Sequence, residues 1–155
     1  RNKQGGGPST WAFRDVGNRK ELVMNSQNNK QTVRDYLAHF KNADVAKLTD
    51  AMSEDATWWI LGQPRLFSDA GTKSKAYMER IWSNLFGHMQ DGLEMTVIGM
   101  VAEENKVAAE IRSYADLTDG RVYENQYHML FTLRHGKIVE VREYADMLLI
   151  ANMFG

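Results

Sequence analysis

The sequence has no cysteine, no long apolar run and no excess of basic residues. Without cysteine there is no disulfide framework, no thiolate nucleophile and no cysteine-ligated metal site. This absence fits a reducing compartment, so we expect a cytoplasmic protein. No segment reaches the roughly 18 apolar residues that a membrane span requires, and the first residues lack the apolar centre of a signal peptide. We therefore expect a soluble protein with no membrane partner.

Charge and known motifs narrow the possible functions further. The formal net charge is -1, which gives no positive field to attract nucleic acid. A glycine-rich phosphate loop, a dinucleotide fingerprint and a serine nucleophile elbow are all missing. The four histidines, His39, His88, His128 and His135, lack the close spacing of a metal site. We predict no nucleic-acid partner, no cofactor and no metal.

The length of 155 residues, with 43% hydrophobic and 25% charged residues, fits one globular domain. Residues 1–27 differ from the rest, because a Gly-Gly-Gly-Pro run is followed by a polar stretch with little periodicity. We interpret residues 1–27 as an N-terminal extension, solvated or in contact with a partner, and residues 28–155 as the domain. Position 1 is not methionine, and Met24 is a candidate start that would make the preceding residues non-native.

Three helices are predicted before the sheet. From Lys30 an apolar stripe with i, i+3, i+4, i+7 spacing predicts the first. Its members are Val33, Tyr36, Leu37 and Phe40. Asp44 is placed to cap a short second helix, and Ser74 to cap a third that continues to Phe86.

Strands dominate the second half of the chain. The aromatic and β-branched run 57–61 predicts a first strand. Four longer strands, joined by tight turns, follow as a meander. They are expected at 93–101, 106–117, 121–133 and 137–146. The apolar end, 147–154, fits either a short helix or one more strand.

This order of elements, from about Lys30 to Asp146, resembles a superfamily of cone-shaped α+β proteins. It includes ketosteroid isomerases, scytalone dehydratases, limonene-epoxide hydrolases and SnoaL-like polyketide cyclases. The segments Gly-Arg-Val-Tyr-Glu-Asn at 120–125, Phe-Thr-Leu-Arg-His-Gly-Lys-Ile at 131–138 and Arg-Glu-Tyr-Ala-Asp at 142–146 carry the resemblance. It implies an α+β fold of the nuclear-transport-factor type, in which a curved mixed β-sheet packs on about three N-terminal helices and encloses a pocket. The same scaffold hosts many chemistries, so function depends on the pocket residues.

Glu143 is the first candidate for catalysis. Residues on one face of the last strand are otherwise apolar, namely Val139, Val141 and Ala145. A carboxylate on such a face loses hydration, which raises its pKa toward the range useful for proton transfer. The resemblance agrees, because the matching family position commonly holds a catalytic aspartate. The alternative is a structural carboxylate paired with Arg112 or a backbone amide.

Glu110 and Arg112 are placed differently by pattern and by resemblance. Alternation alone sends Arg112 to solvent, because the blander face of that strand holds Val107, Ala109, Ile111, Ser113 and Ala115. The resemblance implies that Glu110 and Arg112 lie inside the pocket, where the epoxide hydrolases carry an Arg-x-Asp pair. Here the order is Glu-x-Arg, so epoxide hydrolysis does not transfer directly. In that position the pair would set the charge state of Glu143.

Other pocket residues follow from the same resemblance. It turns Asn125, Tyr127 and Met129 toward the pocket, and Tyr127 with Asn125 could then polarise a carbonyl or enolate oxygen. It also turns Trp58 and Ile60 inward as an apolar wall for a planar ligand. We add Tyr114 and Val141 to the ligand-binding set. His39 is an alternative base, because scytalone dehydratases use histidine. All of these residues could equally serve packing.

The leading hypothesis is a cofactor-independent enzyme for a small hydrophobic substrate, steroid-like or polyketide-like. Glu143, Arg112, Glu110 and Tyr127 would carry acid-base proton transfer in an isomerase, cyclase or related lyase. Two alternatives are a non-catalytic protein that binds a small hydrophobic molecule and an epoxide hydrolase with a rearranged acid-arginine network. A third is an interaction domain. The resemblance also implies a homodimer through the outer sheet face, where the residues available are Gln126, His128 and Arg142.

Overall fold

The computed structural model describes the backbone of residues 11–154 and the side chains of residues 24–154. Six strands form one mixed sheet in the order β2-β1-β6-β5-β4-β3. The strands are β1 (Met52–Ile60), β2 (Gly71–Ser74), β3 (Glu94–Glu103), β4 (Lys106–Asp116), β5 (Val122–Arg134) and β6 (Lys137–Ala145). The helices are α1 (Trp11–Ala38), α2 (Val45–Asp50), α3 (Lys75–Gly87) and α4 (Met147–Phe154).

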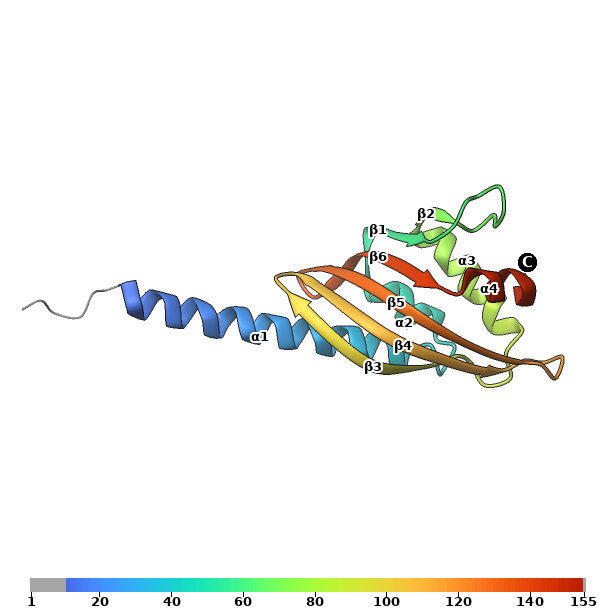
Figure 1. Cartoon of the computed structure of the whole chain (residues 1–155), viewed down its shortest axis with the longest axis horizontal. Coiled ribbons are helices and arrows are strands. Elements are labelled where there is room, and N and C mark those ends of the chain that lie inside the picture. The colour runs from blue at the N-terminus through green and yellow to red at the C-terminus, as the bar shows by residue number, and fades with distance from the viewer. Residues whose placement is uncertain (1–10, 155) are drawn as a thin grey trace, which may run out of the picture.

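The arrangement confirms the predicted α+β class and the curved sheet. Figure 1 shows the strands bending around one side, where α2, α3 and the second half of α1 lie. Strands β3 to β6 form the antiparallel meander, and β6 then pairs in parallel with β1. The parallel pair brings the first strand beside the last, so residues far apart in sequence share one inner face. The strand β2, which pairs antiparallel with β1, was not predicted.

Local signals explain where the helices begin. The side chain of Asp44 accepts a hydrogen bond from the Lys47 amide, and the Ser74 hydroxyl accepts one from the Tyr77 amide. These contacts satisfy amides that have no partner within a helix, so both predicted caps are confirmed. At the other end of the chain, α4 settles the choice between helix and strand in favour of a helix.

The predicted extension is helical where the structure describes it, because α1 begins at Trp11. With 28 residues, this helix is about 42 Å long at 1.5 Å per residue. Figure 1 shows its first half projecting beyond the sheet. The Gly-Gly-Gly-Pro run at 5–8 lies outside the described residues. Among those residues, no helix combines the length and apolar character that crossing a bilayer requires.

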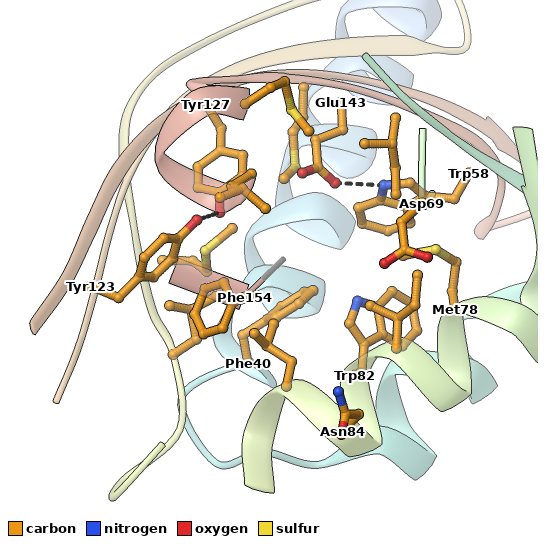
Figure 2. Close-up of a pocket in the computed structure, with 18 of the residues that line it drawn as sticks. Phe40, Trp58, Asp69, Met78, Trp82, Asn84, Tyr123, Tyr127, Glu143 and Phe154 are labelled. Carbon is orange, nitrogen blue, oxygen red and sulfur yellow. Dashed lines mark hydrogen bonds between the residues drawn. The ribbon is translucent and has the colours of Figure 1, made fainter. Parts of the chain in front are cut away.

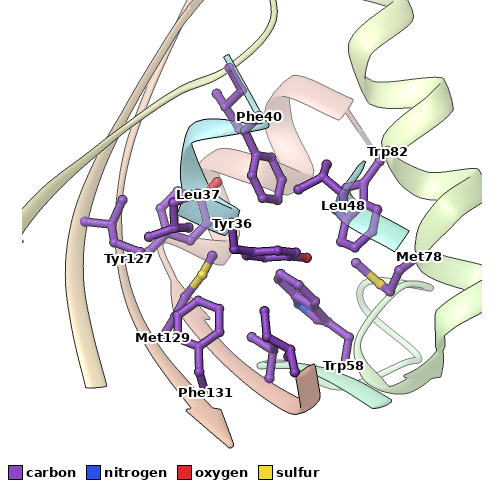
Figure 3. Close-up of a cluster of buried hydrophobic side chains, with 14 of the residues drawn as sticks. Tyr36, Leu37, Phe40, Leu48, Trp58, Met78, Trp82, Tyr127, Met129 and Phe131 are labelled. Atoms are coloured by element: carbon purple, nitrogen blue, oxygen red, sulfur yellow. The ribbon is translucent and has the colours of Figure 1, made fainter. Parts of the chain in front are cut away.

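The core is built around the predicted stripe of α1. Val33, Tyr36, Leu37 and Phe40 are all buried against the inner face of the sheet. The rings of Tyr36 and Phe40 belong to a cluster of edge-on and tilted aromatic contacts, shown in Figure 3. Between ring centroids, Tyr36 lies 6.5 Å from Trp58, and Phe40 lies 5.8 Å from Trp82. Such pairs stabilise beyond the area they bury. The cluster fixes the helices against the sheet and forms one side of the pocket.

Gly92 joins the loop after α3 to the end of α1. Its φ is +75°, and a Cβ there would lie 2.3 Å from the Lys41 carbonyl oxygen and 2.8 Å from that of Phe40. The next amide, that of Leu93, donates to the Phe40 carbonyl at 3.0 Å. The close approach of two backbones therefore requires glycine at this position.

We expect Gly92→Ala to lower the free energy of unfolding by about 3 kcal/mol, because strain and a backbone clash add. Gly87→Ala is the matched control, since a Cβ at this helical position meets nothing within 4 Å. The control should be stabilised by up to about 1 kcal/mol. Urea unfolding of both variants measures the difference, and equal effects would contradict the role of Gly92.

Candidate active site

A pocket lies between the inner face of the sheet, the turn after α1 and the helices α3 and α4, with a cavity volume of about 160 Å³. The sheet contributes Trp58, Ile60, Tyr123, Tyr127, Met129 and Glu143 to its lining. The helices contribute mainly aromatic and aliphatic side chains, among them Met78, Trp82, Ile150 and Phe154, and the turn after α1 contributes Phe40. Figure 2 shows these groups facing a common space. Most of the surface is apolar, and a few polar groups converge on it, as in small-molecule sites.

Glu143 projects from β6 into this pocket, as alternation along the strand predicts. Its strand neighbours are Met129 on β5 and Ile60 on β1. The Trp58 indole Nε1–H donates a hydrogen bond of 2.7 Å to Oε2 of the carboxyl group. Burial raises the pKa of Glu143 to about 7, and the hydrogen bond from Trp58 opposes this only in part. Near neutral pH this carboxyl can therefore both release and accept a proton.

A pair of phenols from β5 also faces the pocket. The hydroxyl oxygens of Tyr123 and Tyr127 are 2.5 Å apart, and Nδ2 of Asn125 donates to the Tyr123 oxygen at 2.9 Å. The bond between the two hydroxyls uses one of their two hydrogens, so the other is available to a ligand oxygen. Burial raises the pKa of Tyr123 to about 12 and raises that of Tyr127 well above its ordinary value, which keeps both groups protonated donors.

Asn125 does not line the pocket but supports it from behind. Besides its bond to Tyr123, its amide nitrogen donates to the Asp146 carbonyl at 3.4 Å. Its side-chain oxygen accepts from the amides of Gln126 and Asp146. The prediction that Asn125 faces the ligand is therefore wrong, because its polar atoms are engaged with neighbouring groups. Its position instead fixes the oxygen of Tyr123.

The expected placement of Glu110, Arg112 and Tyr114 inside the pocket is also wrong. All three are exposed on the outer face of β4, while the alternate residues are buried. The Tyr114 hydroxyl donates to Asp116 at 2.8 Å on that face. The alternation of residues along β4 decides the orientation. Burying the face with the charged side chains would cost far more free energy than burying the mostly apolar face. Arg112 cannot pair with Glu143 from the outer face. The alternative hypothesis of an epoxide hydrolase with this acid-arginine network therefore has no structural support.

The remaining predicted residues divide between pocket and core. Trp58, Ile60 and Met129 line the pocket, as expected. Val141 is fully buried between its strand partners Trp58 and Phe131, and belongs to the core rather than to the ligand surface.

The alternative base and the residues named for the outer sheet face lie outside the pocket, whereas His88, named among the histidines, is exposed and lines it. His39 is half-buried in the turn directly after α1 and does not line the pocket. Gln126 and His128 are exposed on the outer sheet face, and Arg142 stacks over Trp59 there at 4.1 Å. Pairing of two copies across this face stays a prediction.

Three parts of the site were not anticipated. Tyr123 has the same strand parity as Tyr127, and this signal could have identified it. Asp69 lies in the loop between β1 and β2, where no periodicity applies. The helix α4 covers one side of the pocket, and Asp146 caps it by accepting bonds from the amides of Leu148 and Leu149. An aspartate directly before the apolar run 147–154 is the signal that could have predicted this cap.

The volume limits what the pocket can hold. An engineered apolar cavity of about 150 Å³ binds one benzene molecule, so a cavity of this size accommodates about one ring. A fused polycyclic ligand would need α4 or the loop before β2 to move. The end of α4 is held at the site by Phe154, whose ring lies 5.1 Å from that of Tyr123.

The fold and the internal pocket define a protein of the nuclear-transport-factor-like α+β cone class. Residues 33–141 match the family model of the SnoaL-like domain, and the chain belongs to that family. No curated protein matches the chain in sequence.

Solved structures agree on the fold. The BvnE pinacolase from Penicillium brevicompactum superposes with a TM-score of 0.70 at 16% identity, over 81% of this chain and 91% of that one. AusH from Aspergillus nidulans gives 0.69 at 18% identity, over 77% and 84% of the two chains. An NTF2-like protein of unknown function from Burkholderia pseudomallei gives 0.69 at 16% identity, over 81% and 96%.

The raised pKa of Glu143 predicts how stability depends on pH. The folded protein keeps this proton up to about pH 7, whereas the unfolded chain releases it near the ordinary value of 4.5. Between these values the unfolded state binds fewer protons, so the free energy of unfolding falls as pH rises, by about 3 kcal/mol in total. Below and above this window Glu143 contributes no slope.

Glu143→Gln should remove this component, because Gln keeps an acceptor for Trp58 but does not ionise. Urea unfolding of both proteins from about pH 5 to about pH 8 measures it. Subtracting the two curves cancels the other titrating groups. Parallel curves would contradict the burial of an ionisable carboxyl.

Proposed function

We propose that this protein is a cofactor-independent enzyme that moves a proton next to a carbonyl group of a small hydrophobic substrate. The observation that carries the proposal is Glu143, a carboxyl with a pKa of about 7 in an apolar pocket, beside a phenol pair on the adjacent strand. A proton-transfer group works best when its pKa lies near the working pH. The family match supports the same class, because the scaffold encloses small molecules, but it does not specify the reaction.

The proposed reaction has two proton transfers. The Glu143 carboxylate takes the proton from the carbon beside the carbonyl, and the electrons of the broken C–H bond move to the carbonyl oxygen. The phenol pair, Tyr123 and Tyr127, donates its available hydrogen to that oxygen, where negative charge develops. Glu143 then returns the proton to another carbon of the same conjugated system. The product is an isomer, and Glu143 regains its starting state.

Trp58 positions the base in this scheme. Its indole N–H is directed at Oε2, which leaves Oε1 as the oxygen for the substrate. One hydrogen bond also limits how far burial raises the pKa of Glu143. The sequence suggests steroid-like or polyketide-like substrates. The cavity volume restricts the proposed substrates to compounds with about one ring.

The test uses 3-cyclohexen-1-one, whose isomerisation to the conjugated ketone is followed by ultraviolet absorbance. We expect Glu143→Gln to lower kcat by about 10³-fold, the range for loss of an acid-base group. Glu140→Gln is the matched control on the outer side of the same strand and should keep full activity. Wild-type kcat/KM should rise with pH and level off above about pH 7, following ionisation of Glu143.

Two results would count against the proposal. A wild-type protein that binds the ketone without converting it would favour a non-catalytic carrier of hydrophobic molecules. Full activity in Glu143→Gln would remove the carboxyl from the reaction even if the protein is an enzyme.

The phenol pair gives a separate prediction. Replacing one tyrosine by phenylalanine leaves one hydroxyl, whose hydrogen is then free for the substrate oxygen. We expect Tyr123→Phe and Tyr127→Phe each to lower kcat by up to about tenfold, and the double variant by about 100-fold or more. Isomerisation rates of the three variants measure this, with circular dichroism as the fold control. A double variant as fast as the single ones would show that the hydroxyls do not act on the substrate.

A further inference from the structure

Asp69 is a pocket residue for which the proposed reaction has no use. It is half-buried in the loop between β1 and β2 and lines the cavity. The loop is tied by successive turns, since the amides of Leu66 and Phe67 donate to the Gln63 carbonyl and the Ala70 amide to that of Phe67. Ala70 itself is buried. Asp69 is therefore held in place by its backbone.

The carboxylate of Asp69 is also oriented by a side chain. The Tyr77 hydroxyl donates to its Oδ1 at 2.7 Å. The Tyr77 ring in turn contacts two cations, with Lys73 Nζ at 4.8 Å and the Arg80 guanidinium carbon at 5.1 Å from its centroid. These contacts hold the phenol in one direction. Among the described side chains, none donates a hydrogen bond to Oδ2 of Asp69, so this oxygen is available as an acceptor.

Two polar lining residues, Asn84 and His88, are exposed. The polar groups of the pocket that are buried or half-buried are divided by hydrogen-bond character. Figure 2 shows the phenol pair on one side and Asp69 on the other, with the carboxyl group of Glu143 between them. The phenols can donate to a ligand, whereas Asp69 can only accept. A ligand that satisfies both sides carries an acceptor at one end and a hydrogen-bond donor at the other.

The charges that line the pocket also favour a ligand with a hydrogen-bond donor over an anionic one. Within the part of the chain that the structure describes, the pocket lining includes neither lysine nor arginine, and its histidine, His88, is exposed. The lining does include two acidic side chains, Asp69 and Glu143. The cations Lys73 and Arg80 contact the ring of Tyr77 and do not line the cavity. Away from the exposed His88, an anionic ligand would lose its hydration without gaining a counter-charge, whereas a cation would gain one.

We propose that Asp69 determines specificity: it selects a one-ring carbonyl compound that carries a hydroxyl or ammonium group opposite its carbonyl, and the pocket rejects carboxylate and phosphate compounds. This inference rests on the proposed function for the orientation of the carbonyl toward the phenols. It deepens that function by naming the class of substrate.

The experiment compares four acetophenones that differ only at the 4-position, namely aminomethyl, hydroxymethyl, methyl and carboxylate. Isothermal titration calorimetry gives their dissociation constants for the full chain. We expect the aminomethyl compound to bind about tenfold more tightly than the methyl compound, as a charge-assisted hydrogen bond allows. The hydroxymethyl compound should lie between them, and the carboxylate should bind most weakly.

Asp69→Asn tests the residue, because Asn keeps the shape and one acceptor oxygen but removes the negative charge. The variant should lose about tenfold in affinity for the aminomethyl compound and keep its affinity for the methyl compound. Asp91→Asn is the control, since Asp91 is exposed and does not line the pocket. Tyr77→Phe should weaken the same preference in part, because it frees the carboxylate to turn away.

The outcomes separate this inference from the proposed function. A wild-type protein that binds the carboxylate as well as the aminomethyl compound, or binds none of the four, overturns the inference. A preference that persists in Asp69→Asn assigns the selection to another group and also overturns it. If the preference depends on Asp69 but 3-cyclohexen-1-one is not isomerised, the specificity role stands and the proposed catalysis fails.

Discussion

The site depends on one energetically unfavourable placement, that of the acidic side chain of Glu143 in an apolar pocket. Among the side chains that the structure describes, the indole N–H of Trp58 is the group that donates a hydrogen bond to the Glu143 carboxyl. Burial opposes ionisation, so the folded protein carries a group whose charged form costs stability. The aromatic contacts around Tyr36, Phe40 and Trp82 stabilise the fold and so offset this cost, and they also hold the walls of the cavity in place. A carboxyl group with a raised pKa is thus maintained by the packing around it.

Periodicity predicted most of the fold, because it reflects burial directly. The stripe on α1, the meander and the inward turn of Glu143 all follow from apolar spacing of two or three to four residues. The same rule assigned Arg112 to solvent, and the resemblance to epoxide hydrolases overrode it incorrectly. Where a strand has one charged face and one mostly apolar face, the free energy of burial predicts the side-chain orientation better than a family pattern does.

Other parts of the site could not be predicted in this way. Asp69 lies in a loop, and its position depends on turns and on Tyr77 rather than on any repeat. Asn125 has the correct parity to face inward, but its amide is taken up by the backbone of Asp146, which pairing along a single strand does not show. The family describes the scaffold, whereas these neighbours decide which polar atoms a ligand meets.

The contact between Trp58 and Glu143 has an optical consequence. Ionisation places a negative charge 2.7 Å from the indole nitrogen, at the end of the ring system where electron density falls on excitation. The emission of this tryptophan is therefore coupled to the protonation state of the pocket. The protein carries its own spectroscopic indicator of that state, without an added dye.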